Sequence, residues 1–548
     1  MRLEGARRSL RRIAAVAGPR TLARLWDARL VDRAAAAAAL RSIPWLAGRG
    51  PSLGILSHLN ARAFPDKEAV VDRWGTLTWS ELDGRVNRLA GALASLGASP
   101  GDRVALLLRN GRELVEGVLA AQKVGVVACP LNTWARPSEL RPALEQTEPR
   151  VLLYDELHAD RVGELAGGMA LVAAGDGENA VPGSRPYEDL LAEHPPTPPG
   201  PLTLNRGSHR IVIHTSGTTG KPRGAARGTG GGEITSILGL LTAVPLRRDD
   251  VVCIPAPMFH SFGMLTFSLA MLLGCTMVLP ERFDARGTLR MVEDTGATAV
   301  ALVPVMISRI VSLPEEARSG FDLSSLRIVF TSGASLGQEL RARAREVLGD
   351  VLHDLYGSTE AGWVTVATPR DMARRPATVG RPVPGVEVAV FSPEGRPLGA
   401  GETGEIHVRS DATFEGYTSG EGREGRQGYL AVGDLGHLDE RGYLFVEGRA
   451  DDMVVVGGEN VYPVEVEQVI ERVAGVDEVA VVGVPDPEYG RVLAAFVAGS
   501  ASEEDVLKAC RAELASFKVP RHVDIVDELP RTSTGKVLKR ELRAPGGP

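Results

Sequence analysis

A stretch rich in Gly, Ser and Thr, with a Lys inside it, lies near the middle of the chain. It reads TSGTTGKPRG over residues 215–224 and follows the apolar run IVIH at residues 211–214. A strand leading into such a loop suits polyphosphate binding. Glycines let backbone N–H groups converge on an anion, hydroxyls donate hydrogen bonds and the Lys adds a positive charge.

The spacing of this loop differs from that of the P-loop of nucleotide triphosphatases. The P-loop needs four residues between its glycines, and Ser or Thr after its Lys. Here only Thr218 and Thr219 separate the two glycines, and Pro222 follows the Lys. The spacing therefore argues against an ordinary P-loop, and a flexible surface turn remains the alternative for this stretch taken alone.

The segments around the loop predict an α/β fold. Between residues 56 and 191, helix-like periods alternate with short apolar strands such as RVALLL at residues 103–108. After Gly380 the pattern changes to strands punctuated by Gly and Pro, which indicates a β-rich subdomain. From Arg449 a compact piece shows αββα-like alternation.

We therefore expect a large N-terminal domain of α/β layers plus a β-rich subdomain, followed by a small, mobile α+β C-terminal domain. A chain of 548 residues is long enough for two or more cores. The expected division is a basic amphipathic extension at residues 1–50, a main domain at 51–448 and the small domain at 449–548.

Composition narrows the class of protein. The chain is 44% hydrophobic and 24% charged, which is usual for globular proteins, and its net charge of −7 argues against a nucleic-acid partner. The four cysteines show no CxxC spacing, so neither a disulfide framework nor a cysteine metal site is expected, and a cytoplasmic, reducing location is indicated.

Two segments raise the question of membrane contact. The uncharged run Ser261–Pro280 approaches the length of a span, but Gly274 divides it, so a buried helix followed by a buried strand is expected. Residues 1–33 hold nine arginines against three acidic residues, with apolar side chains on another helical face. That pattern indicates peripheral contact with an anionic membrane, and a solvated helix or tail is the alternative.

Further motifs follow the Gly-rich loop in a fixed order. They are TSGTTGKPRG (215–224), PMFHSFG (257–263), TSGAS (331–335), DLYGSTEAG (354–362), GYLAVGDLGHLDERGYL (428–444), GRADDMVVVGGENVYPVEVE (448–467) and PRTSTGKVLK (530–539). Together they resemble the adenylate-forming superfamily of AMP-dependent ligases, and within it the fatty-acyl-CoA synthetases. The resemblance covers about residues 55–542 and leaves only the basic extension outside.

The resemblance assigns the opening loop to the pyrophosphate side of ATP. The residues that would form this grip are Thr215, Ser216, Gly217, Thr218, Thr219, Gly220 and Lys221. The loop is then a phosphate-binding element of a different lineage from the P-loop.

The motif around residue 356 is expected to hold the adenine. Tyr356 would stack on the base, and Gly333 and Ala334 would give the close backbone approach that a flat ring needs. The resemblance adds Asp354 and Gly357 to the nucleotide-binding residues.

Polar residues near these motifs are expected at the phosphates and the ribose. Thr359 would donate to the α-phosphate, and Glu360 would be the oxygen ligand of Mg²⁺. Asp434 resembles the carboxylate that clamps the ribose hydroxyls, supported by Arg449. The family commonly has Thr two residues before this Asp, and Val432 here removes one possible hydroxyl contact.

Lys536, near the C-terminus, is expected to carry adenylation. Its ammonium would offset the negative charge that develops between the attacking carboxylate and the α-phosphate. Asp451 resembles the hinge of the small domain. Rotation there would replace Lys536 by the loop that contains Gly457, Gly458 and Glu459, whose glycines would let the pantetheine arm of CoA pass.

The sequence says less about which carboxylic acid is the substrate. Relatives that activate amino acids usually place an Asp in the PMFHSFG region, whereas this chain offers Phe259, His260 and Ser261, which favours an acid without an α-amine. His260 resembles a residue that lines or gates the acyl pocket, and a structural histidine is the alternative. Residues 303–306 and 333–335 are expected in the pocket wall.

The expected reactants are thus ATP, Mg²⁺, CoA and a carboxylic acid. The basic extension favours a medium- to long-chain fatty acid, because such acids partition to membranes. Three other functions stay open, namely loading of a carrier protein by an acyl-AMP ligase, an aryl or other CoA ligase, and a non-catalytic nucleotide or acyl sensor. Acyl length and oligomeric state do not follow from the sequence.

Overall fold

The computed structural model describes most of the chain after residue 51. The described residues are 28, 37–38, 52–165, 167–198, 211–216, 222–227, 239–358, 361–410, 425–450, 452, 454–456, 459–486, 490–532 and 536–542. Of the predicted basic extension, only Ala28, Ala37 and Ala38 are described. Ala28 is buried in the main core, and its carbonyl accepts a hydrogen bond from the Arg248 amide. The proposed membrane contact of residues 1–33 otherwise lies outside the described residues.

One α/β layer is built on a sheet with the strand order β7-β6-β5-β3-β4-β8-β9. Its strands are β3 (Arg103–Leu107), β4 (Val127–Pro130), β5 (Val151–Asp155), β6 (Ala170–Ala174), β7 (Arg185–Pro186), β8 (Ile211–Ser216) and β9 (Pro222–Arg227). Neighbours are parallel except for β8 and β9, which pair antiparallel. The strand predicted before the Gly-rich loop is therefore confirmed as β8.

Helices accompany this layer. They are α4 (Leu53–Ala63), α5 (Trp79–Ser95), α6 (Arg112–Lys123), α7 (Pro137–Thr147), α8 (Ala159–Gly163) and α9 (Tyr187–Ala192). The start of α5 is fixed by a capping box, in which Thr78 and Glu81 each bind the other's backbone N–H. Its apolar side chains, including Trp79, Leu82 and Leu89, are fully buried against the core.

A second, larger sheet has the order β16-β15-β14-β13-β12-β10-β11-β1-β2. Its strands are β1 (Glu68–Asp72), β2 (Gly75–Thr78), β10 (Val251–Cys253), β11 (Thr276–Val278), β12 (Ala299–Leu302), β13 (Ile328–Thr331), β14 (Leu352–Ser358), β15 (Gly362–Ala367) and β16 (Arg381–Pro382). The central pairs are parallel and the outer pairs are antiparallel. Strands β12 and β13 are buried along their whole length and apolar except for Thr331, as expected for parallel strands covered on both faces.

The helices around this sheet include the uncharged run. They are α11 (Ser261–Leu273), α12 (Ala285–Thr295), α13 (Pro304–Val311), α14 (Glu315–Arg318), α15 (Gln338–Leu348) and α16 (Pro369–Arg374). The predicted division of the run is confirmed: α11 ends at Gly274, whose φ of 72° lies in the left-handed region, and β11 follows. None of the described helices has the length and apolar character needed to cross a membrane.

The β-rich subdomain predicted after Gly380 is also present. Strands β17 (Val386–Phe391), β18 (Gly404–Ser410), β20 (Tyr429–Leu438) and β19 (Gly425–Arg426) form a sheet in that order, and β21 (Leu444–Arg449) pairs with β20. All these pairs are antiparallel.

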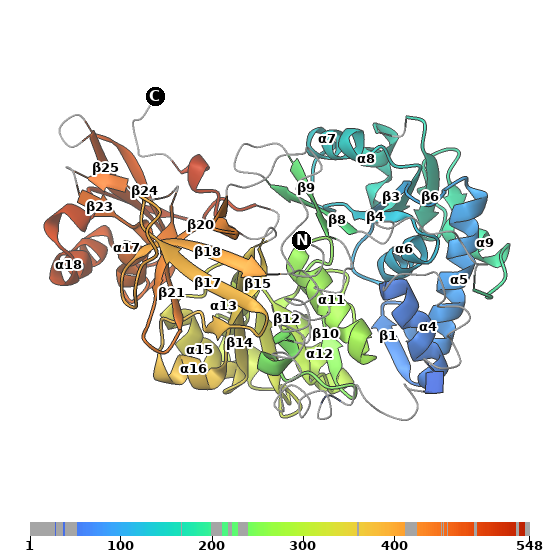
Figure 1. The fold of residues 1–548 in the computed structure, drawn as a ribbon, viewed down its shortest axis with the longest axis horizontal. Helices are drawn as coiled ribbons and strands as arrows, with labels where there is room; N and C mark the ends of the chain where they lie inside the picture. The colour runs from blue at the N-terminus through green and yellow to red at the C-terminus, as the bar shows by residue number, and fades with distance from the viewer. Residues whose placement is uncertain are drawn as a thin grey trace.

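The C-terminal elements have hydrophobic clusters of their own. They are β22 (Val454–Val456), β23 (Glu459–Val461), α17 (Pro463–Ile470), β24 (Val476–Asp486), β25 (Gly490–Gly499), α18 (Glu503–Glu513) and β26 (His522–Val526). Figure 1 shows α17, α18, β24 and β25 at the left end of the molecule, the layer with α5, α6 and α9 at the right end, and the second sheet between them.

Candidate active site

Three of the predicted nucleotide-binding side chains meet at one place, which we call the clamp: Tyr356, Asp434 and Arg449. The Tyr356 hydroxyl donates to Oδ2 of Asp434 at 2.6 Å, and Nη1 of Arg449 donates to Oδ1 at 3.1 Å. Asp434 and Arg449 are register partners on β20 and β21, whereas Tyr356 comes from β14 in the other sheet. The clamp therefore ties the β-rich subdomain to the second, larger sheet.

Burial shapes the electrostatics of the clamp. It raises the pKa of Asp434, while the Tyr356 hydrogen bond and the charges of Arg449 and Lys536 act to lower that pKa. Burial, together with the Asp434 charge, raises the pKa of Tyr356 well above its usual value. Tyr356 consequently keeps its proton and serves as a donor, and the carboxylate is held in a fixed orientation.

Arg449 also contacts the position where this chain departs from the family pattern. Its Nη1 lies 3.4 Å from the backbone carbonyl of Val432, and the Val432 side chain is buried. The backbone at residue 432 thus supports the clamp through Arg449, although the side chain offers no hydroxyl.

Glycines open the backbone beside Tyr356. Gly333 follows β13 with a φ of 97°, which favours glycine, and both it and Ala334 are exposed. Ser332 ties this turn to β14 by donating to the Leu355 carbonyl at 2.8 Å. At Gly357 a Cβ would lie 2.2 Å from the Gly362 carbonyl oxygen, so the bulge between β14 and β15 admits no side chain there.

Asp354 has a structural partner. Its Oδ2 accepts from Nη2 of Arg341 at 2.6 Å, and both residues are buried. Arg341 also donates to the carbonyls of Pro376 and Thr378, so the pair joins β14, α15 and the segment before β16. No pattern in the sequence identified Arg341, and the nucleotide contact of Asp354 stays a prediction.

His260 lies at the N-cap of α11 among aromatic side chains. Its ring is 4.3 Å from that of Phe259, which meets Trp134 edge-on at 5.5 Å, and Phe262 lies 5.2 Å from Phe330. The sequence analysis did not identify Trp134 or Phe330 as part of this site. The aromatic residues of PMFHSFG were the only signal that further aromatic side chains would pack there.

The imidazole of His260 is held neutral. Burial, and to a lesser degree the charge of Lys536, lowers its pKa to about 3. Its Nε2 is buried with no hydrogen-bond partner among the described residues. Buried polar atoms are almost always paired, so an unpaired nitrogen here is consistent with a polar substrate atom arriving next to it.

Lys536 reaches this site from the C-terminal part of the chain. Its side chain is exposed, and its backbone N–H donates to Oγ1 of Thr532 at 3.1 Å. Because its positive charge acts on both His260 and Asp434, the structure brings the predicted adenylation lysine to the clamp and to the aromatic residues together.

Several predicted residues cannot be placed. Gly217, Thr218, Thr219, Gly220, Lys221, Thr359, Glu360, Asp451, Gly457 and Gly458 lie outside the described residues. The backbones of Thr215 and Ser216 belong to β8 and that of Glu459 to β23. Among the described residues no cluster of His, Cys, Asp or Glu would hold a metal ion. Because Glu360 lies outside the described residues, its Mg²⁺ role remains a prediction.

The described residues fit an adenylate. A fixed carboxylate suits ribose hydroxyls, the open backbone at Gly333 admits a flat base, and an exposed Lys suits a phosphate. Family models agree with this geometry. The description "AMP-binding enzyme" matches residues 58–418, and "AMP-binding enzyme C-terminal domain" matches residues 465–536. The chain belongs to the AMP-binding enzyme family.

Relatives of this family member cover nearly its whole length. A feruloyl-CoA synthase of Amycolatopsis sp is 35% identical, covering 90% of this chain and 99% of that protein. The long-chain-fatty-acid–CoA ligase FadD13 of Mycobacterium tuberculosis (strain ATCC 25618 / H37Rv) is 30% identical, covering 85% and 92%. The solved structure of the anthranilate CoA ligase AuaEII with anthranoyl-AMP has a TM-score of 0.82 at 27% identity, covering 89% and 96%.

These findings confirm the adenylate-forming superfamily, its α/β fold with a small C-terminal domain, and an AMP-forming acid–thiol ligase that uses ATP, Mg²⁺ and CoA. The narrower placement among fatty-acyl-CoA synthetases stays a prediction. The relatives of this AMP-binding enzyme are named for acids as different as ferulate and long-chain fatty acids.

Proposed function

We propose that this AMP-binding enzyme activates a medium- to long-chain fatty acid and transfers the acyl group to CoA. The observation that carries the proposal is the group of buried aromatic side chains at His260. Phe259 packs against the His260 ring, Phe262 packs against Phe330, and the imidazole is neutral. Aromatic surface favours a hydrocarbon tail, because burial of apolar surface stabilises binding, and a neutral imidazole gives an ammonium group no negative charge to pair with.

In the first half-reaction, a carboxylate oxygen of the acid attacks the α-phosphorus of ATP. The new acyl–oxygen–phosphorus bond forms as the bond to the β-phosphate oxygen breaks, and pyrophosphate leaves. Asp434 would orient the ribose, and the Lys536 ammonium would offset charge on the transferring phosphate. The backbone at Gly333 would admit the adenine.

Mg²⁺, when bound, neutralises charge on the phosphate oxygens, and Glu360 is its proposed ligand. The loop of residues 215–221 is the proposed grip for the departing pyrophosphate.

In the second half-reaction, the sulfur of CoA attacks the acyl carbon. The carbon–oxygen bond to AMP breaks, AMP leaves with the electron pair, and the thiol proton passes to solvent. We propose that the part of the chain after Arg449 turns about Asp451 for this step. That movement would withdraw Lys536 and bring the loop with Gly457 and Gly458 to the site.

An aryl acid is the second candidate substrate. The feruloyl-CoA synthase is 35% identical and the structure with anthranoyl-AMP superimposes with a TM-score of 0.82. The ring of Phe259 would also suit an aromatic acid, since aromatic rings pack edge to face.

Mass spectrometry of products distinguishes these candidates. The protein is incubated with ATP, Mg²⁺, CoA and equal amounts of dodecanoate and ferulate. Our proposal predicts dodecanoyl-CoA as the main product, with a kcat/KM at least about tenfold above that of ferulate, because a hydrophobic pocket gains roughly 0.8 kcal/mol per buried methylene. Feruloyl-CoA as the main product would establish the second candidate instead.

Two other outcomes would overturn transfer to CoA. Acyl-adenylate without thioester would indicate a carrier protein as acceptor. Absence of AMP release from any acid would indicate a nucleotide or acyl sensor.

A further inference from the structure

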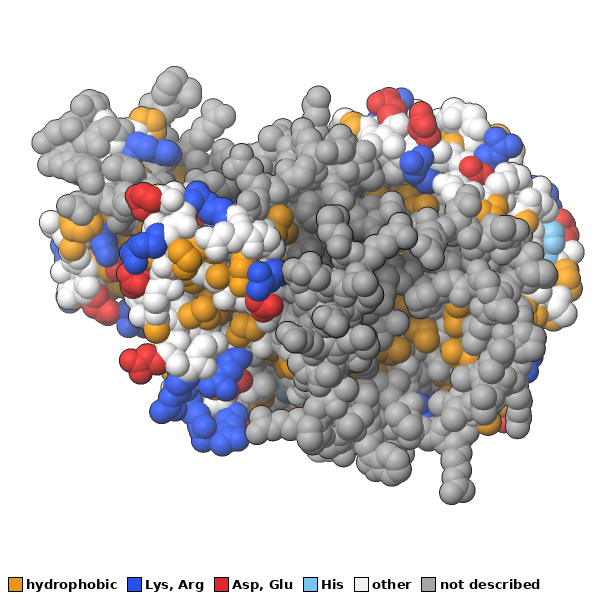
Figure 2. All heavy atoms as spheres, viewed as in Figure 1, with side chains coloured by type: hydrophobic (Ala, Val, Ile, Leu, Met, Phe, Trp, Pro, Cys, Tyr) orange, Lys and Arg blue, Asp and Glu red, His pale blue; other side chains and the backbone are white. Residues whose placement is uncertain are grey.

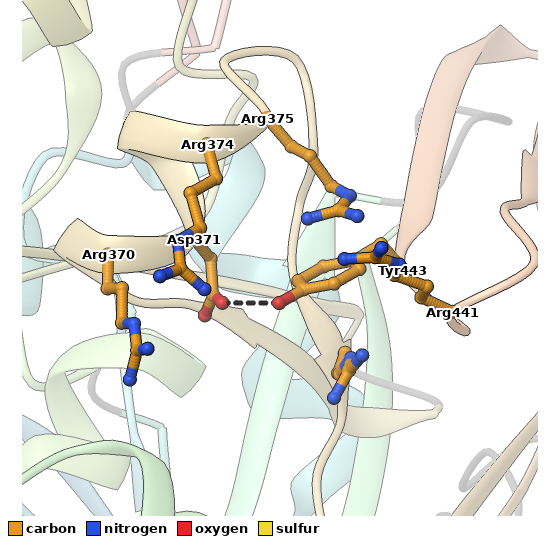
Figure 3. A pocket seen from close by; sticks show the side chains of 7 residues that line it. Arg370, Asp371, Arg374, Arg375, Arg441 and Tyr443 are labelled. Carbon is orange, nitrogen blue, oxygen red and sulfur yellow. Dashed lines mark hydrogen bonds between the residues drawn. The ribbon is translucent and has the colours of Figure 1, made fainter.

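A second concave site lies away from the clamp, at α16 and the turn between β20 and β21. We call it the arginine pocket. Its cavity of about 330 Å³ is lined by one tyrosine, one aspartate and the guanidinium groups of Arg370, Arg374, Arg375, Arg381 and Arg441. Figure 3 shows Arg370, Arg374, Arg375 and Arg441 arranged around Asp371 and Tyr443.

Local structure places these arginines. A capping box between Thr368 and Asp371, with Pro369 at the first helical position, starts α16, which carries Arg370 and Arg374. On the face seen in Figure 2, Lys and Arg side chains gather where Figure 1 places α16.

Asp371 and Tyr443, the two other residues that line the pocket, form hydrogen bonds that join its two sides. Oδ1 of Asp371 accepts from the buried Tyr443 hydroxyl at 2.7 Å, and its Oδ2 accepts from the backbone and hydroxyl of Thr368. Asp371 thus fixes α16 to the β20–β21 turn.

Tyr443 is sandwiched between cations. The guanidinium carbons of Arg375 and Arg381 each lie 4.3 Å from its ring centroid. One face of a phenol ring has room for one guanidinium at that distance, so the two lie on opposite faces. The ring is therefore not available to stack on a nucleobase, and a ligand would be recognised by the arginines alone.

Positive charge in the pocket is not balanced. Arg375 pairs with Asp439 at 2.9 Å. Arg370, Arg374, Arg381 and Arg441 are exposed, and none of them has a carboxylate partner within the part of the chain that the structure describes. Like charges held around one cavity repel each other, so an anion with several charges would stabilise this arrangement.

We propose that the arginine pocket binds a soluble, phosphate-bearing small molecule with two or more negative charges. Guanidinium forks pair with phosphate oxygens through two parallel hydrogen bonds, which suits several arginines facing one cavity. A lipid ligand would need apolar side chains to contact its acyl chains, and no aliphatic residue lines the pocket. We therefore expect the ligand to be dissolved in water. The large hydrophobic side chains exposed among the described residues, Trp74, Trp134, Leu157 and Ile525, all lie outside its lining.

The site is separate from the clamp but joined to it by strands. Strand β15 leads to α16 and pairs with β14, which carries Tyr356. The turn with Tyr443 connects β20 and β21, which carry Asp434 and Arg449. A ligand in the arginine pocket would therefore hold together the ends of the two hairpins that form the clamp, without touching ATP.

Hydrogen–deuterium exchange on the full chain tests the proposal, with tripolyphosphate as the probe. We expect tripolyphosphate to slow amide exchange over residues 369–375 and 439–443. The concentration for half-maximal protection should rise about tenfold in Arg374→Gln, because a hydrogen bond to a charged group is worth roughly 1.5–3 kcal/mol. It should also rise when KCl is added, because salt screens the attraction.

Arg290→Gln is the matched control, since Arg290 is exposed on α12, outside the pocket. It should leave the protection unchanged, and Arg374→Gln should leave adenylation intact, which shows that the variant folds. Protection by tripolyphosphate confined to residues 215–221, or equal protection in both variants, would overturn the proposal. Protection of the pocket by phosphatidylglycerol vesicles but not by tripolyphosphate would also overturn it in favour of a lipid headgroup.

Discussion

The clamp and Lys536 differ in how the structure holds them, although we propose that both act on the same adenylate. The Asp434 carboxylate in the clamp is largely buried, and Tyr356 and Arg449 each donate a hydrogen bond to it. Lys536 is exposed and belongs to the C-terminal part of the chain. The contrast fits our proposal that the nucleotide-binding groups are fixed before ATP binds, whereas the charge for adenylation belongs to a part of the chain that turns away for the second half-reaction.

The contact between the two parts of the chain includes a carboxylate. Glu471, at the end of α17, lies against Gly337 at the start of α15, where a Cβ would be 2.4 Å from Oε2. Burial, with the nearby charges of Glu467 and Glu339, raises the pKa of Glu471 to about 7. We therefore expect the arrangement that brings Lys536 to the clamp to depend on pH.

Removing the ammonium should have the largest effect. Lys536→Ala is expected to slow acyl-adenylate formation about 10²–10³-fold, the usual loss when one group that stabilises transition-state charge is deleted. The measurement is single-turnover formation of acyl-AMP. Lys508→Ala, which removes an exposed lysine on α18, should behave as wild type. An equal loss in the two variants would contradict the role given to Lys536.

Weakening the clamp should have an intermediate effect. Asp434→Asn keeps the shape but removes the charge, so the KM for ATP should rise about 10- to 100-fold, with kcat less affected. Tyr356→Phe should raise it about fivefold, because Asp434 loses one donor. Asp350→Asn, on an exposed carboxylate, serves as the control in steady-state kinetics. An unchanged KM for ATP in Asp434→Asn would exclude Asp434 from the nucleotide site.

The smallest effect is expected at the contact between the two parts. The pKa of Glu471 in the docked arrangement, about 7, lies above the ordinary value of 4.5. The docked state therefore binds more protons, and the stability of the contact is lost as pH rises from about 5 to 8. Wild-type adenylation should fall severalfold relative to Glu471→Gln across that window.

The measurement for Glu471 is the pH profile of single-turnover adenylation. Glu504→Gln, which changes an exposed residue on α18, should follow the wild-type profile. A constant ratio of Glu471→Gln to wild type from pH 5 to 8 would show that this contact does not control docking.

The sequence predicted much of the framework because its signals are local. Gly274 marked the end of α11, and short apolar runs marked the parallel strands. The resemblance also singled out Tyr356, Asp434 and Arg449, which the structure brings together. Their contacts with one another could not be predicted, because the Tyr356–Asp434 hydrogen bond joins residues 78 positions apart on different sheets.

The arginine pocket was even less predictable from the sequence than the contacts of the clamp. Arg374, Arg381 and Arg441 are spread along the chain, and each alone reads as an ordinary solvated residue. They come to one cavity because the segment from Asp371 to Gly380 contacts the turn between β20 and β21, through the bridge between Gly380 and Leu444 and the pairs Arg375–Asp439 and Asp371–Tyr443. The contact of Glu471 with Gly337 likewise depends on packing between elements that no local pattern specifies.

Thioester formation from supplied acyl-adenylate tests the contrast between the clamp and Lys536 most directly. Lys536→Ala and Asp434→Asn are each given dodecanoyl-AMP and CoA, and dodecanoyl-CoA is measured over time. Our account predicts that Lys536→Ala forms the thioester at close to the wild-type rate, whereas Asp434→Asn needs a higher concentration of the adenylate. A loss in Lys536→Ala as large as its loss of adenylation would contradict the account.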